Sequence, residues 1–109
     1  MAISILHTID SGTSAGTHHF PTSLGFDYRG GKSTFAFSGT DFSNVTHIKI
    51  QANFDGTATN WIDLTDSADN AVEVDSPTIL TVDIGKCKLR FLGLVAGGDT
   101  QSDINITVS

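Results

Sequence analysis

The sequence has little of what would crosslink a small protein or anchor it in a membrane. Its 109 residues include one cysteine, Cys87, so no disulfide can form within the chain, and we expect the thiol to be a small buried residue. No apolar run approaches the roughly 20 residues of a membrane-spanning helix, so no membrane partner is predicted. The N-terminus also lacks the features of a signal peptide, which predicts synthesis in a cytoplasm.

Positive charge is scarce as well. Six Lys and Arg residues face 12 acids, which gives a net charge of −6. Because an acidic surface repels phosphate backbones, the sequence predicts no nucleic-acid partner. Every acid except Glu73 is an aspartate, and Asp favours turns where Glu favours helices. Abundant Thr, Ser, Gly, Ile, Val and Phe then indicate an all-β chain with almost no helix.

The stretch Thr46–Leu64 is the clearest local pattern. Apolar and polar residues alternate up to Phe54, as in a strand with one face in a core. Asp55-Gly56 begins a loop, and Trp61 opens the return strand. Because a buried indole removes a large apolar surface from water, we expect Trp61 to be the largest body in the core.

Turn signals recur roughly every 8–12 residues along the whole chain, which is typical of a β-sandwich. We therefore predict one antiparallel β-sandwich domain, jelly-roll-like or immunoglobulin-like, with about eight short strands. Residues 1–30 would form an N-terminal strand and a loop-rich arm of this domain, and residues 31–109 its body. The residues expected to anchor the core are Trp61, Phe35, Phe37, Ile48, Ile50 and Phe91.

One stretch, Leu89–Val95, carries apolar residues on both faces of the expected strand. Either this is a central strand covered by a loop, or its second face lies in a subunit interface. In the second case Gly93 would let another backbone approach closely. The residues expected at such contacts are Ile3, Ile5, Leu6, Leu92 and Leu94.

Short motifs in the sequence do not assemble into a catalytic pattern. Gly12–Gly16 matches G-x-S-x-G, but the nucleophile elbow needs a helix after the serine, and Pro21 follows shortly. Gly31-Lys32-Ser33 lacks the first glycine of a phosphate-binding loop. We therefore predict that the protein is not an enzyme and expect no catalytic residue.

Metal binding is not indicated either. His18-His19 are expected in an exposed loop, with no third ligand at metal-site spacing. Asn53, Asp55, Thr57 and Asp63 could surround a calcium ion, but the EF-hand order of ligands is absent. The sequence thus predicts no metal and no cofactor.

Four segments between Ile48 and Val108 resemble those of small phage virion proteins. They are the strand Ile48-Lys49-Ile50-Gln51 with the turn Asp55-Gly56, the strand Trp61-Ile62-Asp63-Leu64, the run Lys88-Leu89-Arg90-Phe91, and the last strand Ile104–Val108. Chains of this kind resemble β-sandwich decoration (cement) proteins of tailed-phage heads and head or tail fibre modules. Residues 1–30 do not share the resemblance, and it brings no catalytic residues.

The resemblance implies a structural protein located in the virion. It would cap or cement the head lattice by binding the major capsid protein or other virion subunits, as a homo-oligomer such as a trimer. The alternative is a glycan-binding or adhesin module on a fibre, because sandwich loops bind sugars on exposed aromatic rings. That alternative requires Trp61 and Tyr28 to be exposed.

Overall fold

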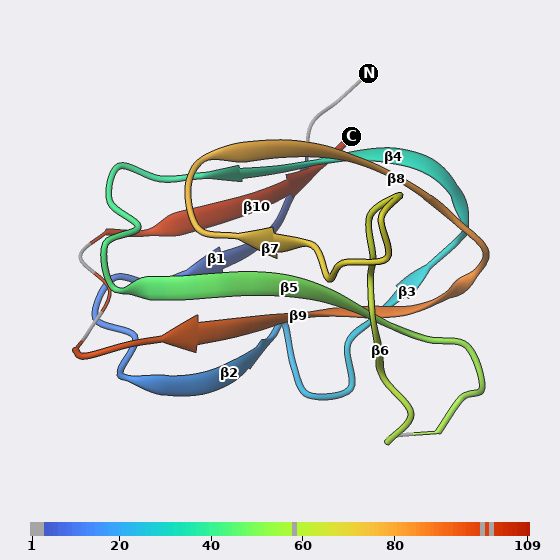
Figure 1. The fold of residues 1–109 in the computed structure, drawn as a ribbon, viewed down its shortest axis with the longest axis horizontal. Coiled ribbons are helices and arrows are strands. Elements are labelled where there is room, and N and C mark those ends of the chain that lie inside the picture. Colours follow the sequence, from blue (N-terminus) through green and yellow to red (C-terminus); the bar gives the residue numbers. More distant parts are fainter. Residues whose placement is uncertain (1–3, 58, 99, 101) are drawn as a thin grey trace.

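The computed structural model describes residues 4–57, 59–98, 100 and 102–109, with side chains from His7 onward. These residues form ten β-strands and no helix (Figure 1). Hence none of them forms a helix long and apolar enough to cross a membrane. The strands are β1 Ser4–Ile9, β2 Gly16–Phe20, β3 Phe26–Tyr28, β4 Gly31–Ser38, β5 Val45–Asn53, β6 Ile62–Asp63, β7 Glu73–Val74, β8 Thr78–Ile84, β9 Cys87–Val95 and β10 Ile104–Val108.

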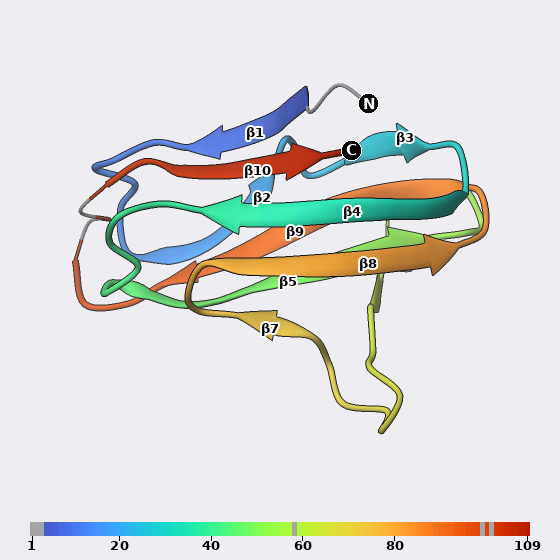
Figure 2. The ribbon, with the colours of Figure 1, turned by 90° about the horizontal axis from the view of Figure 1, so that it is seen from above.

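The strands form two antiparallel sheets that pack as a sandwich (Figure 2). The four-stranded sheet has the order β1-β10-β4-β8, and the six-stranded sheet has the order β2-β9-β5-β6 with β3 on β9 and β7 on β5. Pairing is nested along the chain: β1 pairs with β10, β2 with β9, β4 with β8, and β5 with β6 and β7. A long hairpin wrapped across two sheets in this way is a jelly roll, which decides between the two sandwich types expected.

Alternation along the strands builds the core. In β9 every second residue from Cys87 to Val95 is buried, and the buried positions of β4 alternate in the same way. Five of the expected core anchors, Phe35, Phe37, Ile48, Ile50 and Phe91, are at most 1% exposed. Cys87 is a buried free thiol, as predicted, and burial raises its pKa.

The aromatic centre of the core is Phe91 and not Trp61. The Phe91 ring lies 5.9 Å from Phe37, 6.0 Å from Phe35 and 6.1 Å from Phe26. Trp61 is half-buried and lies outside the core cluster, so its expected place in the core is wrong. The physical reason is that β6, which follows it, is a two-residue strand at the edge of its sheet, where one side of a residue stays open to water.

The N-terminal region belongs to the body of the sandwich. β1 joins the four-stranded sheet, while β2 and β3 both pair with β9 in the other sheet. Residues 4–28 therefore do not reach away from the domain as an arm. His18 and His19 were expected in an exposed loop, but they are half-buried in β2, because the main chain of this polar stretch is paired with β9.

A different segment leaves the body. Residues 64–72, which we call the projecting arm, join β6 to β7 and extend beyond β8 in the view of Figure 2. The arm is a small hairpin closed by the bridge Thr65–Ala71 and by a 2.8 Å hydrogen bond from the Asp66 amide to the Asn70 carbonyl. At its tip the Asp66 carboxylate accepts the amides of Ala68 and Asn70.

Candidate functional site

The outer face of the six-stranded sheet carries Leu92 and Leu94 on β9. β9 is a central strand between β2 and β5, and both leucines are half-buried. Their cross-strand neighbours are polar or cationic residues whose stems can shield part of a leucine. These neighbours are Thr17, His19, His47 and Lys49. The face is thus a narrow apolar stripe within a polar frame, and its role as an interface stays a prediction.

Gly93 lies on the opposite face of β9 from the two leucines. A Cβ atom there would come within 2.9 Å of Cε2 of Phe20, so the missing side chain makes room for that ring inside the sandwich. The structure therefore explains the glycine at position 93 by packing within the chain, and not by the approach of another subunit's backbone as expected. Of the other expected contact residues, Ile3 lies outside the described residues, and only the backbone of Ile5 and Leu6 is described, in β1.

A lysine–aspartate ion pair and a histidine–glutamate contact lie beside the leucine stripe. His47 Nδ1 is 3.1 Å from Glu73 Oε2, and Lys49 Nζ is 3.4 Å from Asp63 Oδ2. The Gln51 amide donates to the other oxygen of Asp63 at 2.9 Å. Because the lysine and its carboxylate are partly buried, these contacts fix the charge pattern of the face more firmly than fully exposed pairs would.

Trp61 occupies one corner of the same face. The guanidinium carbon of Arg90 lies 4.2 Å from the centroid of the indole, a cation–π geometry. Arg90 is held there by donating to Gln51 Oε1 and to the Ser23 carbonyl, each at 2.8 Å. One face of the indole is therefore covered by a fixed cation.

A small hollow of about 120 Å³ adjoins the indole. It is lined by Leu24, Gly56, Thr57, Trp61 and Lys88. Tyr28, the second aromatic residue needed for sugar stacking, is only 5% exposed and donates its hydroxyl to the Gly31 carbonyl at 2.6 Å. The corner thus offers one aromatic ring and not two.

The loop after β5 is organised by its own polar side chains. One oxygen of the Asp55 carboxylate accepts hydrogen bonds from the backbone amide and the hydroxyl of Thr57. The other oxygen accepts a hydrogen bond from the side-chain amide of Asn60. These hydrogen bonds, the one from Asn60 first, lower the pKa of Asp55. The four residues considered for calcium do not converge, since Asp63 pairs with Lys49 instead. Within the described part of the chain, no three His, Cys, Asp or Glu residues gather as a metal site.

The G-x-S-x-G match lies in the turn between β1 and β2. Gly16 already begins β2, so a strand follows the serine where the nucleophile elbow requires a helix. His18 Nε2 lies 2.8 Å from the carbonyl oxygen of Ser14. The imidazole therefore contacts the main chain of the turn, and the arrangement of a serine hydrolase is not formed by these residues.

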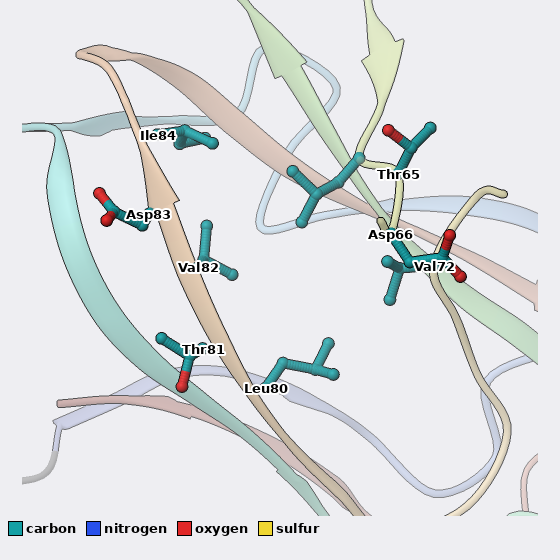
Figure 3. Close-up of a pocket in the computed structure, with 9 residues that line it drawn as sticks. Thr65, Asp66, Val72, Leu80, Thr81, Val82, Asp83 and Ile84 are labelled. Carbon is teal, nitrogen blue, oxygen red and sulfur yellow. The ribbon is translucent and has the colours of Figure 1, made fainter. Parts of the chain in front are cut away.

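A groove of about 350 Å³ separates β8 from the projecting arm (Figure 3). Leu80 and Val82 on β8 and Val72 on the arm point into it, whereas Asp83 points to the other side of β8. The groove is lined by Leu64, Thr65, Asp66, Val72, Leu80, Thr81, Val82, Asp83 and Ile84. Sequence reasoning missed this site, although the alternation of Leu80, Val82 and Ile84 was visible, because only the topology places β8 at an edge.

Comparison with known protein families, with curated proteins and with solved structures finds no match to this chain.

Proposed function

We propose that this protein is a structural subunit that attaches to a larger protein assembly. In the form that the sequence resemblance implies, it is a decoration protein bound to the major capsid protein of a phage head, as a homo-oligomer. The observation that carries the proposal is the leucine stripe on β9, which lies on the open outer face of a sheet whose inner face is already filled by the core. A second apolar stripe on a central strand serves no packing within the sandwich.

The polar frame of the stripe supports the same function. Interfaces combine an apolar centre with a polar rim, and here Leu92 and Leu94 are flanked by histidine and lysine positions. Lys49 contacts Asp63 on this face and His47 contacts Glu73, so the rim presents donors and carboxylates that suit a partner surface of complementary pattern.

Mass spectrometry of purified particles tests the location. We expect the chain among the virion proteins, and its absence from them would remove the capsid form of the proposal. Leu92→Asp should weaken attachment or oligomer formation while the monomer stays folded, because the position faces outward. Thr107→Asp is the matched control, since it puts the same charge on β10 in the other sheet. Equal assembly by the two variants would show that the β9 face is not the interface.

A second candidate function is favoured by one observation, the exposed part of the Trp61 ring beside the hollow lined by Leu24 and Thr57. In that function the corner binds a sugar ring in a glycan-binding or adhesin module. Tryptophan emission should then be quenched by iodide, and sugars should change the emission and protect it. If iodide quenches and no sugar changes the emission, the corner is surface without a glycan.

A further inference from the structure

The strand β8 has an open edge. In the part of the chain that the structure describes, β8 pairs with β4 on one side and with no strand on the other. An open edge presents main-chain donors and acceptors that can pair with another extended chain. β7 and the projecting arm extend past this edge from the opposite sheet, so that a strand added beside β8 would lie over them (Figure 2).

The register shows which main-chain groups point outward. Thr34 on β4 exchanges both of its backbone hydrogen bonds with Ser109, at 2.9 and 3.0 Å. The main-chain N–H and C=O of Thr34 therefore point away from β8. Thr34 and Thr81, which lie opposite each other, therefore form a non-hydrogen-bonded pair in the β4–β8 ladder. Because bonded and non-bonded pairs alternate, the N–H and C=O groups of Ile79, Thr81 and Asp83 point to the open edge.

The side chains beside this edge alternate in the way that a strand-binding groove requires. Leu80, Val82 and Ile84 line the groove toward the projecting arm, where Val72 closes the far side (Figure 3). Ile79, 74% exposed, and Asp83 lie on the opposite face of β8. Leu80 and Ile84 are half-buried and Val82 between them is only 2% exposed, so an added strand would meet Leu80, Ile84 and Val72 on its inner face and solvent on its outer face.

We propose that this edge binds an extended peptide segment of a partner protein by strand addition, with apolar side chains in the groove and basic side chains on the outer face. The inference goes beyond the function proposed above, because it holds whether or not the partner is a capsid protein.

Charge selects the kind of segment. The residues that line the groove include Asp66 and Asp83 and no cation, and Asp69 stands at the tip of the arm. The cation nearest in register is Lys32, which is opposite Asp83 on β4. A lysine or arginine of the added strand beside Asp83 would form a favourable cross-strand pair, whereas an acid there would be repelled.

A second copy of this chain fits the edge poorly. Pairing two β8 strands would bring two projecting arms, each with Asp66 and Asp69, to the same face of one continuous sheet. Both copies also carry a net charge of −6. Like charges at close range oppose such a dimer, so the occupant is a basic, apolar-alternating segment.

The probe for a test is the peptide acetyl-VKVKVTT-amide, which places valines over the groove and a lysine beside Asp83 when it adds antiparallel to β8. The matched controls are acetyl-VEVEVTT-amide, and the lysine peptide N-methylated at both lysines, which removes donors aimed at β8. Binding is measured by fluorescence polarisation of labelled peptides, and its place by amide hydrogen exchange followed by NMR.

We expect the amides of Ile79, Thr81 and Asp83 to exchange rapidly in the free protein, because they point to the open edge, and the lysine peptide to slow that exchange. The glutamate peptide should bind at least about tenfold more weakly, a difference in binding free energy of about 1.4 kcal/mol. The N-methylated peptide should not bind. No binding of the lysine peptide at millimolar concentration, or protection confined to other residues, would overturn the proposal. Protection of these amides in a peptide-free dimer would show that a second copy is the occupant.

Two variants complete the test. Thr81→Pro removes an outward N–H without loss of a β4 bond, which an edge strand tolerates, and should reduce affinity at least about tenfold. Thr81→Val keeps the N–H and is its control. Asp83→Lys should reverse the preference between the lysine and glutamate peptides. The Asp83→Lys variant tests the proposal even if the proline variant fails to fold. An unchanged preference between the two peptides would contradict the charge argument.

Discussion

At the scale of single residues, packing energy is concentrated at Phe91, whose ring contacts three other aromatic rings inside the sandwich. We predict that Phe91→Ala lowers the free energy of unfolding by about 3–5 kcal/mol, because it removes a fully buried ring and leaves a cavity. Trp61→Ala should cost roughly 1 kcal/mol, from partial exposure and the lost contact with Arg90. Urea unfolding of both variants measures the difference. Similar losses would mean that the indole carries core packing after all.

Two histidines make stability depend on pH. Burial lowers the pKa of His7, although the nearby charge of Asp10 raises it in part. Burial is also the main cause that lowers the pKa of His19, and the charges of Arg90 and His18 lower it further. The folded state then binds fewer protons than the unfolded chain, whose histidines titrate near 6.5, so stability falls as pH drops through and below 6.5. We predict that Tm decreases between about pH 7 and pH 5.

The double variant His7→Gln and His19→Gln is the control for this pH dependence. Its Tm should change less over the same interval, because the two groups that resist protonation are absent. An unaltered pH profile in that variant would assign the dependence to other groups.

At the scale of elements, a strand could be predicted from the sequence where its own residues alternate between apolar and polar, and could not where distant pairing decides its structure. β4, β5, β8, β9 and β10 alternate large apolar residues, so their strand character could be predicted. β2 could not, because Gly16–Phe20 holds few apolar residues and its pairing with β9 decides its structure. The exposure of Trp61 and the groove beside β8 depend on which strands lie at sheet edges. Edge positions follow from pairing between distant segments, which no local pattern reports.

The turn before β3 contains a backbone position that constrains two other elements. Gly25 has φ +73°, and a Cβ atom there would lie 2.4 Å from the Leu89 carbonyl oxygen and 2.9 Å from Cη2 of Trp61. We predict that Gly25→Ala destabilises the protein through both the left-handed backbone and the clash. Gly12→Ala is the matched control, since Gly12 has φ +86° and a Cβ atom added there would have nothing within 4 Å.

Gly12→Ala should therefore cost only about 1–2 kcal/mol for the backbone, and Gly25→Ala about 1–3 kcal/mol more. Urea unfolding measures both values, and a shift in tryptophan emission in Gly25→Ala should report the displaced indole. Equal losses in the two variants would show that the turn moves away freely from β9.

At the scale of the whole molecule, nested pairing places the first and last strands side by side. Ser4 pairs with Val108, and β10 lies between β1 and β4 in the four-stranded sheet (Figure 1). Each end thus contributes to the middle or edge of a sheet, and the contacts that complete the fold join residues far apart in sequence. The fold depends on these pairings and less on the order in which the chain visits them.

This view predicts that a circular permutant folds. Joining the original ends through a short flexible linker, and opening the chain between Ser67 and Ala68, preserves every strand pair, because the new ends lie at the exposed tip of the projecting arm. We expect cooperative urea unfolding and a native-like near-ultraviolet spectrum. Opening the chain between Leu89 and Arg90 instead interrupts β9, which pairs with β2, β3 and β5, and should abolish folding. An unfolded arm permutant would show that the order of the chain matters beyond the nested pairing, and a folded β9 permutant would show that an unbroken β9 is not required.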